Sequence, residues 1–110
     1  PKPKPKPAGA KATAKPTAGD VDTTADEARL LAGAQRALKG GDPNRALEIT
    51  KTHARRYPQG KLIESREATR AAARCALEPE RGPGILAEFR AAHGNSAFSG
   101  RVERSCGRTP

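Results

Sequence analysis

The stretch TADEARLLAGAQRALKGGDPNRALEITKTHARRYPQG, residues 24–60, decides the predicted fold. It opens with Thr24, whose hydroxyl can accept the backbone amide of Glu27 while the Glu27 carboxylate reaches back, which is a capping box at a helix N-terminus. Apolar residues then recur on one face of the predicted helix, at Leu30, Ala34, Ala37 and Leu38. The pair Gly40-Gly41 predicts the end of this helix.

A second helix is predicted directly after the two glycines. Asp42 can cap it, and Pro43 suits the first helical position, where a missing N–H costs nothing. Its predicted inner face consists of Ala46, Ile49, Thr50, His53, Ala54 and Tyr57. Pro58-Gln59-Gly60 ends the helix. Because so few residues join the two helices, they must form an antiparallel hairpin.

Three further helices are expected over residues 61–77, 85–93 and 98–106, with residues 78–84 as a Pro/Gly loop. Ser96 is the predicted cap of the last helix, whose inner face carries Phe98, Val102 and Cys106. The inner stripe of the 61–77 helix is expected at Leu62, Ser65, Ala68, Thr69, Ala72, Cys75 and Ala76. No segment alternates with period two. The predicted fold class is therefore all-α: two antiparallel helix hairpins and a short C-terminal capping helix.

The composition fits one small helical domain. Of the 110 residues, 38 are hydrophobic, but 21 of these are Ala, and Trp and Met are absent. A large sandwich, barrel or doubly wound sheet needs more bulky or β-branched residues. No apolar run approaches the roughly 20 residues that span a bilayer.

The first 20 residues differ from the rest in composition. They hold five of the ten prolines and have a net charge of +4 from five Lys and one Asp. The lysines are Lys2, Lys4, Lys6, Lys11 and Lys15. Such a segment buries too little apolar surface to fold. We expect a disordered linker over residues 1–22, a helical domain over 23–107 and a tail over 108–110. The linker is either a solvated spacer or a basic arm for an anionic polymer or membrane surface.

Five positions carry a resemblance to the tetratricopeptide repeat: Ala34, Gly41, Asp42, Ala46 and Pro58. The resemblance implies stacked hairpins over about residues 25–60 and 61–95, closed by the last helix. The segments GDPNRAL, HARRYPQGKL, RCAL and RVERSC also resemble the C-terminal periplasmic module of myxobacterial envelope proteins related to outer-membrane assembly factors. That similarity implies a periplasmic or cell-envelope setting, with an anchor upstream of Pro1; a cytoplasmic setting is the alternative.

The two cysteines fall on predicted inner faces. Cys75 and Cys106 can therefore approach each other to disulfide distance, and a loop of this length would contribute about 3–4 kcal/mol. The envelope resemblance favours the disulfide. Two buried free thiols are the alternative.

Catalytic and metal-binding patterns are weak. His53, Cys75, His93 and Cys106 lack the spacing of a zinc site, and Cys75 with His93 lacks a third orienting group. No Gly-rich phosphate loop is present. We therefore expect no enzyme activity and no cofactor. His53 is predicted to pack between helices and to bond a neighbour such as Glu64 or Glu67.

Arginines supply the remaining candidate site. Arg45, Arg55 and Arg56 are predicted to cluster, with Lys51 and Lys61, around the end of the second helix. Arg66, Arg70 and Arg74 form a predicted ridge along the third helix, in which Glu64 and Glu67 pair with some of them. This face is either simply solvated or recognises an acidic peptide or carboxylate terminus, as the repeat resemblance implies. The predicted function is a protein-interaction or scaffold module of the bacterial cell envelope. The alternative is polyanion or nucleic-acid binding through the N-terminal lysines.

Overall fold

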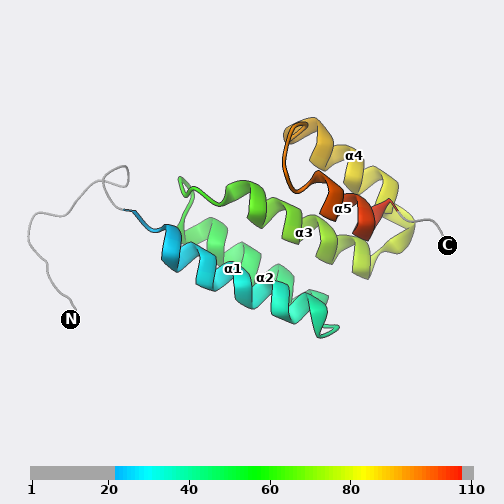
Figure 1. Ribbon diagram of the computed structural model, residues 1–110. Helices are drawn as coiled ribbons and strands as arrows, with labels where there is room; N and C mark the ends of the chain where they lie inside the picture. Colours follow the sequence, from blue (N-terminus) through cyan, green and yellow to red (C-terminus); the bar gives the residue numbers. More distant parts are fainter. Residues whose placement is uncertain (1–21, 108–110) are drawn as a thin grey trace, which may run out of the picture.

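A computed structural model describes residues 22–107 of the chain. Within that range the fold is all-helical, with five α-helices, one short 3-10 turn and no strand (Figure 1). The elements are α1 (Thr24–Lys39), α2 (Pro43–Arg56), α3 (Ile63–Leu77), η2 (Pro79–Arg81), α4 (Gly82–Ala92) and α5 (Ser99–Cys106). The predicted linker, apart from Asp22, and the predicted tail over 108–110 lie outside the described residues.

The predicted α1–α2 hairpin is confirmed. Gly41 has φ +84°, a conformation that favours glycine, and the chain reverses there (Figure 1). The Asp42 carboxylate accepts the Arg45 amide at 3.1 Å, and Pro43 occupies the first turn of α2. Ala34 of α1 and Ala46 of α2 are buried together with Ala73 of α3. The small side chains at this junction let three helices meet closely.

The predicted capping box at Thr24 is wrong. The helix is preceded by Thr23, whose hydroxyl donates to the Glu27 carboxylate at 2.8 Å. Thr24 instead donates both its amide and its hydroxyl to Asp22, at 3.0 and 2.6 Å. Glu27 is fully buried and serves as an acceptor for groups far away in the sequence. The Thr-x-x-Glu pattern therefore marks the right helix start but the wrong hydrogen bonds.

The inner faces of α1 and α2 are broader than predicted. Leu31, which the periodicity left out, is buried, whereas Leu30 is only half-buried. On the predicted stripes, Ala34, Ala46, Thr50 and His53 are buried, and Ala37, Leu38, Ile49, Ala54 and Tyr57 are half-buried. The reason is that each of these helices packs against two neighbours, since α1 and α2 both contact α3.

Helix α3 lies at the centre of the molecule and contacts all four other helices. Its buried residues are Ala68, Thr69, Ala71, Ala72, Ala73 and Cys75. Ala76 was predicted to face inward but is exposed, whereas Ala71 and Ala73 are buried because helices cover α3 on several sides. The helix also begins two residues later than predicted.

The two C-terminal helices begin at different residues than predicted. Helix α4 starts at Gly82, with Pro83 in its first turn, so the predicted 78–84 loop is largely helical. The Ser96 hydroxyl accepts the Phe98 amide at 3.0 Å, which stabilises the turn before α5. It does not cap α5 itself, which begins at Ser99.

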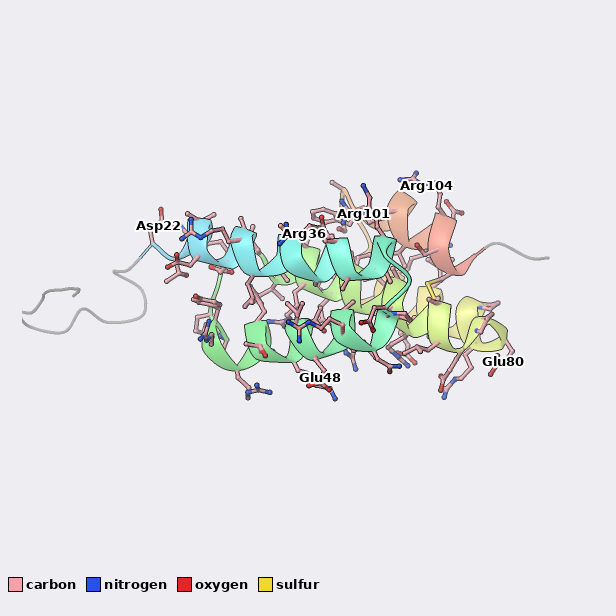
Figure 2. The ribbon with its side chains drawn as sticks, turned by 90° about the horizontal axis from the view of Figure 1, so that it is seen from below. Asp22, Arg36, Glu48, Glu80, Arg101 and Arg104 are labelled. Carbon is pink, nitrogen blue, oxygen red and sulfur yellow. A yellow bond between two sulfur atoms is a disulfide. The ribbon has the colours of Figure 1, made fainter. Side chains whose placement is uncertain are left out.

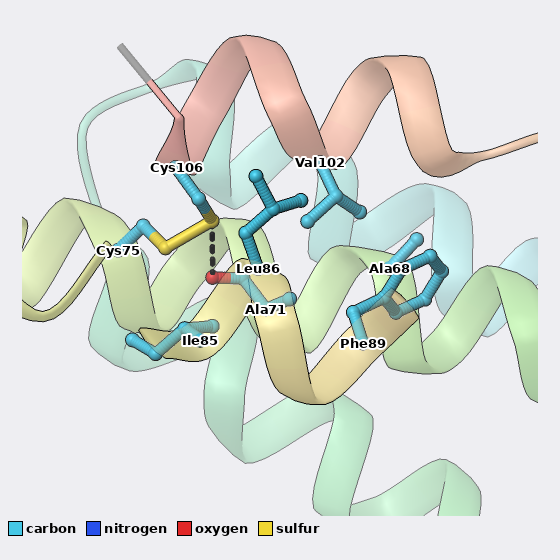
Figure 3. Close-up of a cluster of buried hydrophobic side chains, with 8 residues drawn as sticks. All are labelled: Ala68, Ala71, Cys75, Ile85, Leu86, Phe89, Val102 and Cys106. Carbon is cyan, nitrogen blue, oxygen red and sulfur yellow. Dashed lines mark hydrogen bonds between the residues drawn. A yellow bond between two sulfur atoms is a disulfide. The ribbon is translucent and has the colours of Figure 1, made fainter. Parts of the chain in front are cut away.

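The largest apolar cluster joins α3, α4 and α5 (Figure 3). It contains Ala68, Ala71, Cys75, Ile85, Leu86, Phe89, Val102 and Cys106. The two cysteines form the predicted disulfide, with a Cα–Cα distance of 5.3 Å. Phe98 packs against the edge of the cluster, so all three predicted inner residues of α5 contribute to the core.

Candidate binding surfaces

The predicted arginine ridge on α3 is interrupted at Arg66. This side chain is only 13% exposed. Its Nε donates to Glu67 at 2.9 Å, and one of its terminal nitrogens lies 3.4 Å from Nδ1 of His53. Arg66 is thus committed to contacts within the fold, and the prediction that it belongs to an exposed binding ridge is wrong.

Of the other two ridge residues, Arg70 is exposed and Arg74 is half-buried. Arg70 pairs with Glu67 at 3.6 Å, the predicted i, i+3 contact, and Arg74 donates to Glu88 of α4 at 3.2 Å. Glu64, the other predicted partner, forms no ion pair within residues 22–107. Arg70 and Arg74 therefore form a short basic pair, partly neutralised by carboxylates.

The predicted cluster at the end of α2 does not form as a unit. Arg45 lies in the first turn of the helix, and Arg55 and Arg56 lie in its last turn. Ten residues of helix separate Arg45 from Arg55, which corresponds to about 15 Å along the axis. All three side chains are exposed, but they belong to two different ends of α2.

A groove that the sequence did not indicate lies over α3, between α1 and α5. Its volume is about 380 Å³. It is lined by Gln35, Leu38 and Lys39 of α1, Thr69 and Ala72 of α3, and Arg101 and Ser105 of α5. Thr69 and Ala72, both short, form the floor, and the rims combine the apolar Leu38 with the polar side chains of Gln35, Lys39, Arg101 and Ser105.

The groove is basic. Its lining contains Lys39 and Arg101 but no carboxylate, and neither cation forms an ion pair among the described residues. The Arg101 guanidinium lies over the Phe98 ring, 5.1 Å from its centroid, which restricts its position. Figure 2 shows Arg36 of α1 along the same side of the molecule as Arg101 and Arg104 of α5.

One local feature of the sequence relates to this groove: Phe98 and Arg101 are spaced i, i+3, which allows the Arg101 side chain to lie over the Phe98 ring. The spacing alone does not place Arg101 beside Lys39, since 62 residues separate them along the chain. Only the packing of α1 and α5 on the same helix brings the two cations to one groove.

A second polar cluster is buried between α1, α2 and the start of α3. Nε2 of His53 lies 2.9 Å from the Glu27 carboxylate, and both side chains are fully buried. The prediction that His53 bonds Glu64 or Glu67 is wrong. The Glu27 carboxylate also accepts the amides of Lys61 and Leu62, the two residues that precede α3, at 3.3 and 3.1 Å.

The charge of Glu27 is maintained by these donors. Burial raises its pKa, but hydrogen bonds from Thr23, Leu62, His53 and Lys61 together bring the pKa below the ordinary glutamate value. Because Arg66 can only donate, Nδ1 of His53 accepts, which leaves Nε2 as the donor to Glu27. The cluster lines none of the hollows described here, and its geometry is that of a structural anchor.

The sequence patterns considered for metal or nucleophilic chemistry are not assembled in the described residues. Cys75 is bonded to Cys106, so it offers no thiolate to pair with His93. Among residues 22–107, no three side chains of His, Cys, Asp or Glu gather as metal ligands. None of the helices in this range is both long enough and apolar enough to span a membrane.

No family model, curated protein or solved structure matches the chain.

Proposed function

We propose that residues 23–107 form a non-enzymatic protein-interaction module, and that the groove between α1 and α5 binds an acidic segment of a partner protein. The observation that carries the proposal is the charge of the groove lining, which has two cations and no carboxylate. Carboxylates of the partner would form charge-assisted hydrogen bonds with Lys39 and Arg101. Gln35, Thr69 and Ser105 add neutral polar groups along the same path.

We further propose that the module works in the bacterial cell envelope. The disulfide supports this setting, because such bonds persist in oxidising compartments and are rare in the cytosol. The resemblance to the myxobacterial envelope module adds the same implication. In this proposal the Pro/Lys-rich segment serves as the spacer that presents the helical domain.

The test is a binding titration with a labelled decapeptide of alternating Glu and Ala, followed by fluorescence anisotropy. The double variant Lys39→Glu/Arg101→Glu reverses both groove charges. If each exposed ion pair contributes about 1 kcal/mol, we expect the affinity to fall about tenfold or more.

The matched control is Arg55→Glu/Arg56→Glu, which changes the net charge by the same amount on exposed residues of α2. We expect this control to lower the affinity by only about twofold, through long-range electrostatics. Equal losses in the two double variants would show that the peptide responds to overall charge and would refute the groove.

The alternative function is polyanion or nucleic-acid binding through the five lysines at Lys2, Lys4, Lys6, Lys11 and Lys15, which lie outside the described residues. The observation in its favour is that no carboxylate precedes Asp20. For duplex DNA it predicts a log–log salt slope of about −4 to −5 that disappears on deletion of residues 1–20. The groove proposal predicts that peptide binding survives the same deletion.

A further inference from the structure

We propose that the face formed by α2, α3 and α4 is a second binding surface, and that it takes a partner segment in which carboxylates lie between apolar side chains. The surface is centred on Arg70 and Arg74, with one hollow on each side of this pair. It does not share residues with the groove between α1 and α5. The inference therefore goes beyond the proposed function and is independent of it.

The two hollows beside the arginines differ in the apolar surface that they offer to a partner. The hollow toward α2 has a volume of about 250 Å³ and includes Leu47 and Leu77 in its lining. The hollow toward α4 has a volume of about 190 Å³; its lining includes Glu67 and Glu88, and its residues Ile85 and Phe89 are core residues that are only 2% and 5% exposed. Arg70 and Arg74 line both hollows.

Leu77 gives this face an exposed apolar side chain. It is the one large hydrophobic residue that is exposed among residues 22–107, with 39% of its surface accessible. It sits at the end of α3, in the same hollow as Leu47, which is half-buried. A partner that covers both leucines would remove apolar surface from water, which favours association.

The charge of the hollow toward α2 selects an acidic partner. Its lining has three cations, Lys51, Arg70 and Arg74, and a single carboxylate, Glu78. Arg74, which is 23% exposed, donates to Glu88 at 3.2 Å, but the other two cations are more exposed and their pairs are longer: Lys51 lies 3.9 Å from Glu48, and Arg70 lies 3.6 Å from Glu67. Such exposed pairs contribute little, so carboxylates of a partner can replace them.

The two surfaces lie on nearly opposite sides of α3. With 3.6 residues per turn, the midpoint of Arg70 and Arg74 is about 150° from the midpoint of Thr69 and Ala72, which line the other groove. A partner bound to either surface would leave the other surface accessible. The module can therefore hold two acidic segments at once, as a scaffold does.

The test uses a blocked peptide with Leu residues on either side of an Asp-Glu pair, titrated into ¹⁵N-labelled full chain and followed by amide chemical shifts. We expect the largest changes at residues 47, 51, 70, 74 and 77. Leu77→Ser and Arg70→Gln should each weaken binding about fivefold or more, whereas Lys39→Glu/Arg101→Glu should not change it.

Three outcomes would overturn the proposal. Shifts centred on Lys39 and Arg101 would assign the peptide to the other groove. Equal binding of a peptide with Ser in place of Leu would show that charge alone drives the contact. Unchanged affinity in Arg70→Gln would exclude the basic pair from the site. This variant remains informative even if Leu77→Ser alters folding, because the Arg70 side chain supports no buried contact.

Discussion

The α1–α2 hairpin and the α4–α5 pair both pack on α3, but different contacts hold them there. The junction of the hairpin consists of alanines with half-buried aliphatic residues, together with the buried polar pair Glu27–His53. The α4–α5 junction has bulky apolar side chains and a disulfide. A domain with few large apolar residues can therefore be stabilised in two ways: by a polar anchor, the Glu27–His53 pair, at one end and by a disulfide at the other.

Breaking the covalent bond should have the largest effect. Reduction, or the variant Cys75→Ala/Cys106→Ala, should lower the free energy of unfolding by about 3–4 kcal/mol, because the loop closed by the bond regains its freedom in the unfolded chain. For a domain of this size that corresponds to a fall in Tm of about 15–25 °C, measured by circular dichroism.

Hydrogen exchange under the same conditions shows which helices lose amide protection when the disulfide is absent. Amides of α5 should lose protection before amides of α1, since only α5 is tied by the disulfide. Equal loss of amide protection in α5 and α1 would contradict the view that the disulfide stabilises mainly the α4–α5 end of the molecule.

Removing the polar anchor should be the next largest effect. Glu27→Ala leaves the amide of Leu62 and the ring N–H of His53 without their acceptor. We expect a loss of about 2–3 kcal/mol in unfolding free energy, measured by urea denaturation. Exchange should now rise first in α1 and at the start of α3, the reverse of the disulfide variant. A loss no larger than that of the exposed-site control Glu80→Ala would contradict the role of Glu27.

Two glycines of α4 differ in how closely they approach α5. An added Cβ at Gly82 would lie 2.3 Å from the Cys106 carbonyl oxygen, whereas nothing lies within 4 Å of a Cβ at Gly84. Gly82→Ala should therefore force α4 and α5 apart and cost about 2 kcal/mol. Gly84→Ala should stabilise the helix slightly, by up to about 1 kcal/mol. Thermal unfolding of the two variants should shift in opposite directions.

Acid should weaken the polar anchor and produce the smallest effect. Because the pKa of Glu27 is lower in the folded chain than in the unfolded chain, its contribution is present above the ordinary glutamate pKa and is lost as pH falls through the folded pKa. Stability should thus decline below about pH 4.5. In Glu27→Gln the decline should be shallower; identical pH profiles for the two proteins would contradict this linkage.

Local signals in the sequence were sufficient for the number of helices and for the α1–α2 hairpin, but not for where α3, α4 and α5 begin. Asp42-Pro43 and Gly40-Gly41 act through neighbouring backbone groups, so their effect is readable without the fold. Periodicity also placed Cys75 and Cys106 on inner helix faces, but it left open whether they form a disulfide or two buried free thiols; the structure shows the disulfide.

The candidate sites were less predictable, because they depend on long-range contacts. Glu27 meets Leu62 across 35 positions and His53 across 26. Arg66 looked like part of a surface ridge, but the ring of His53 turns it inward. Lys39 and Arg101 line one groove only because α1 and α5 both pack on α3. None of these contacts leaves a periodic pattern in the chain.

The position of the disulfide also determines how the chain responds to a pulling force. The bond joins residues 31 positions apart, and all of α4 lies inside the closed loop. A force applied at the ends of the chain can strip α1 and α2 from α3, but it cannot extend the loop. About 100 Å of contour length, at roughly 3.5 Å per residue, stays locked until the bond is reduced.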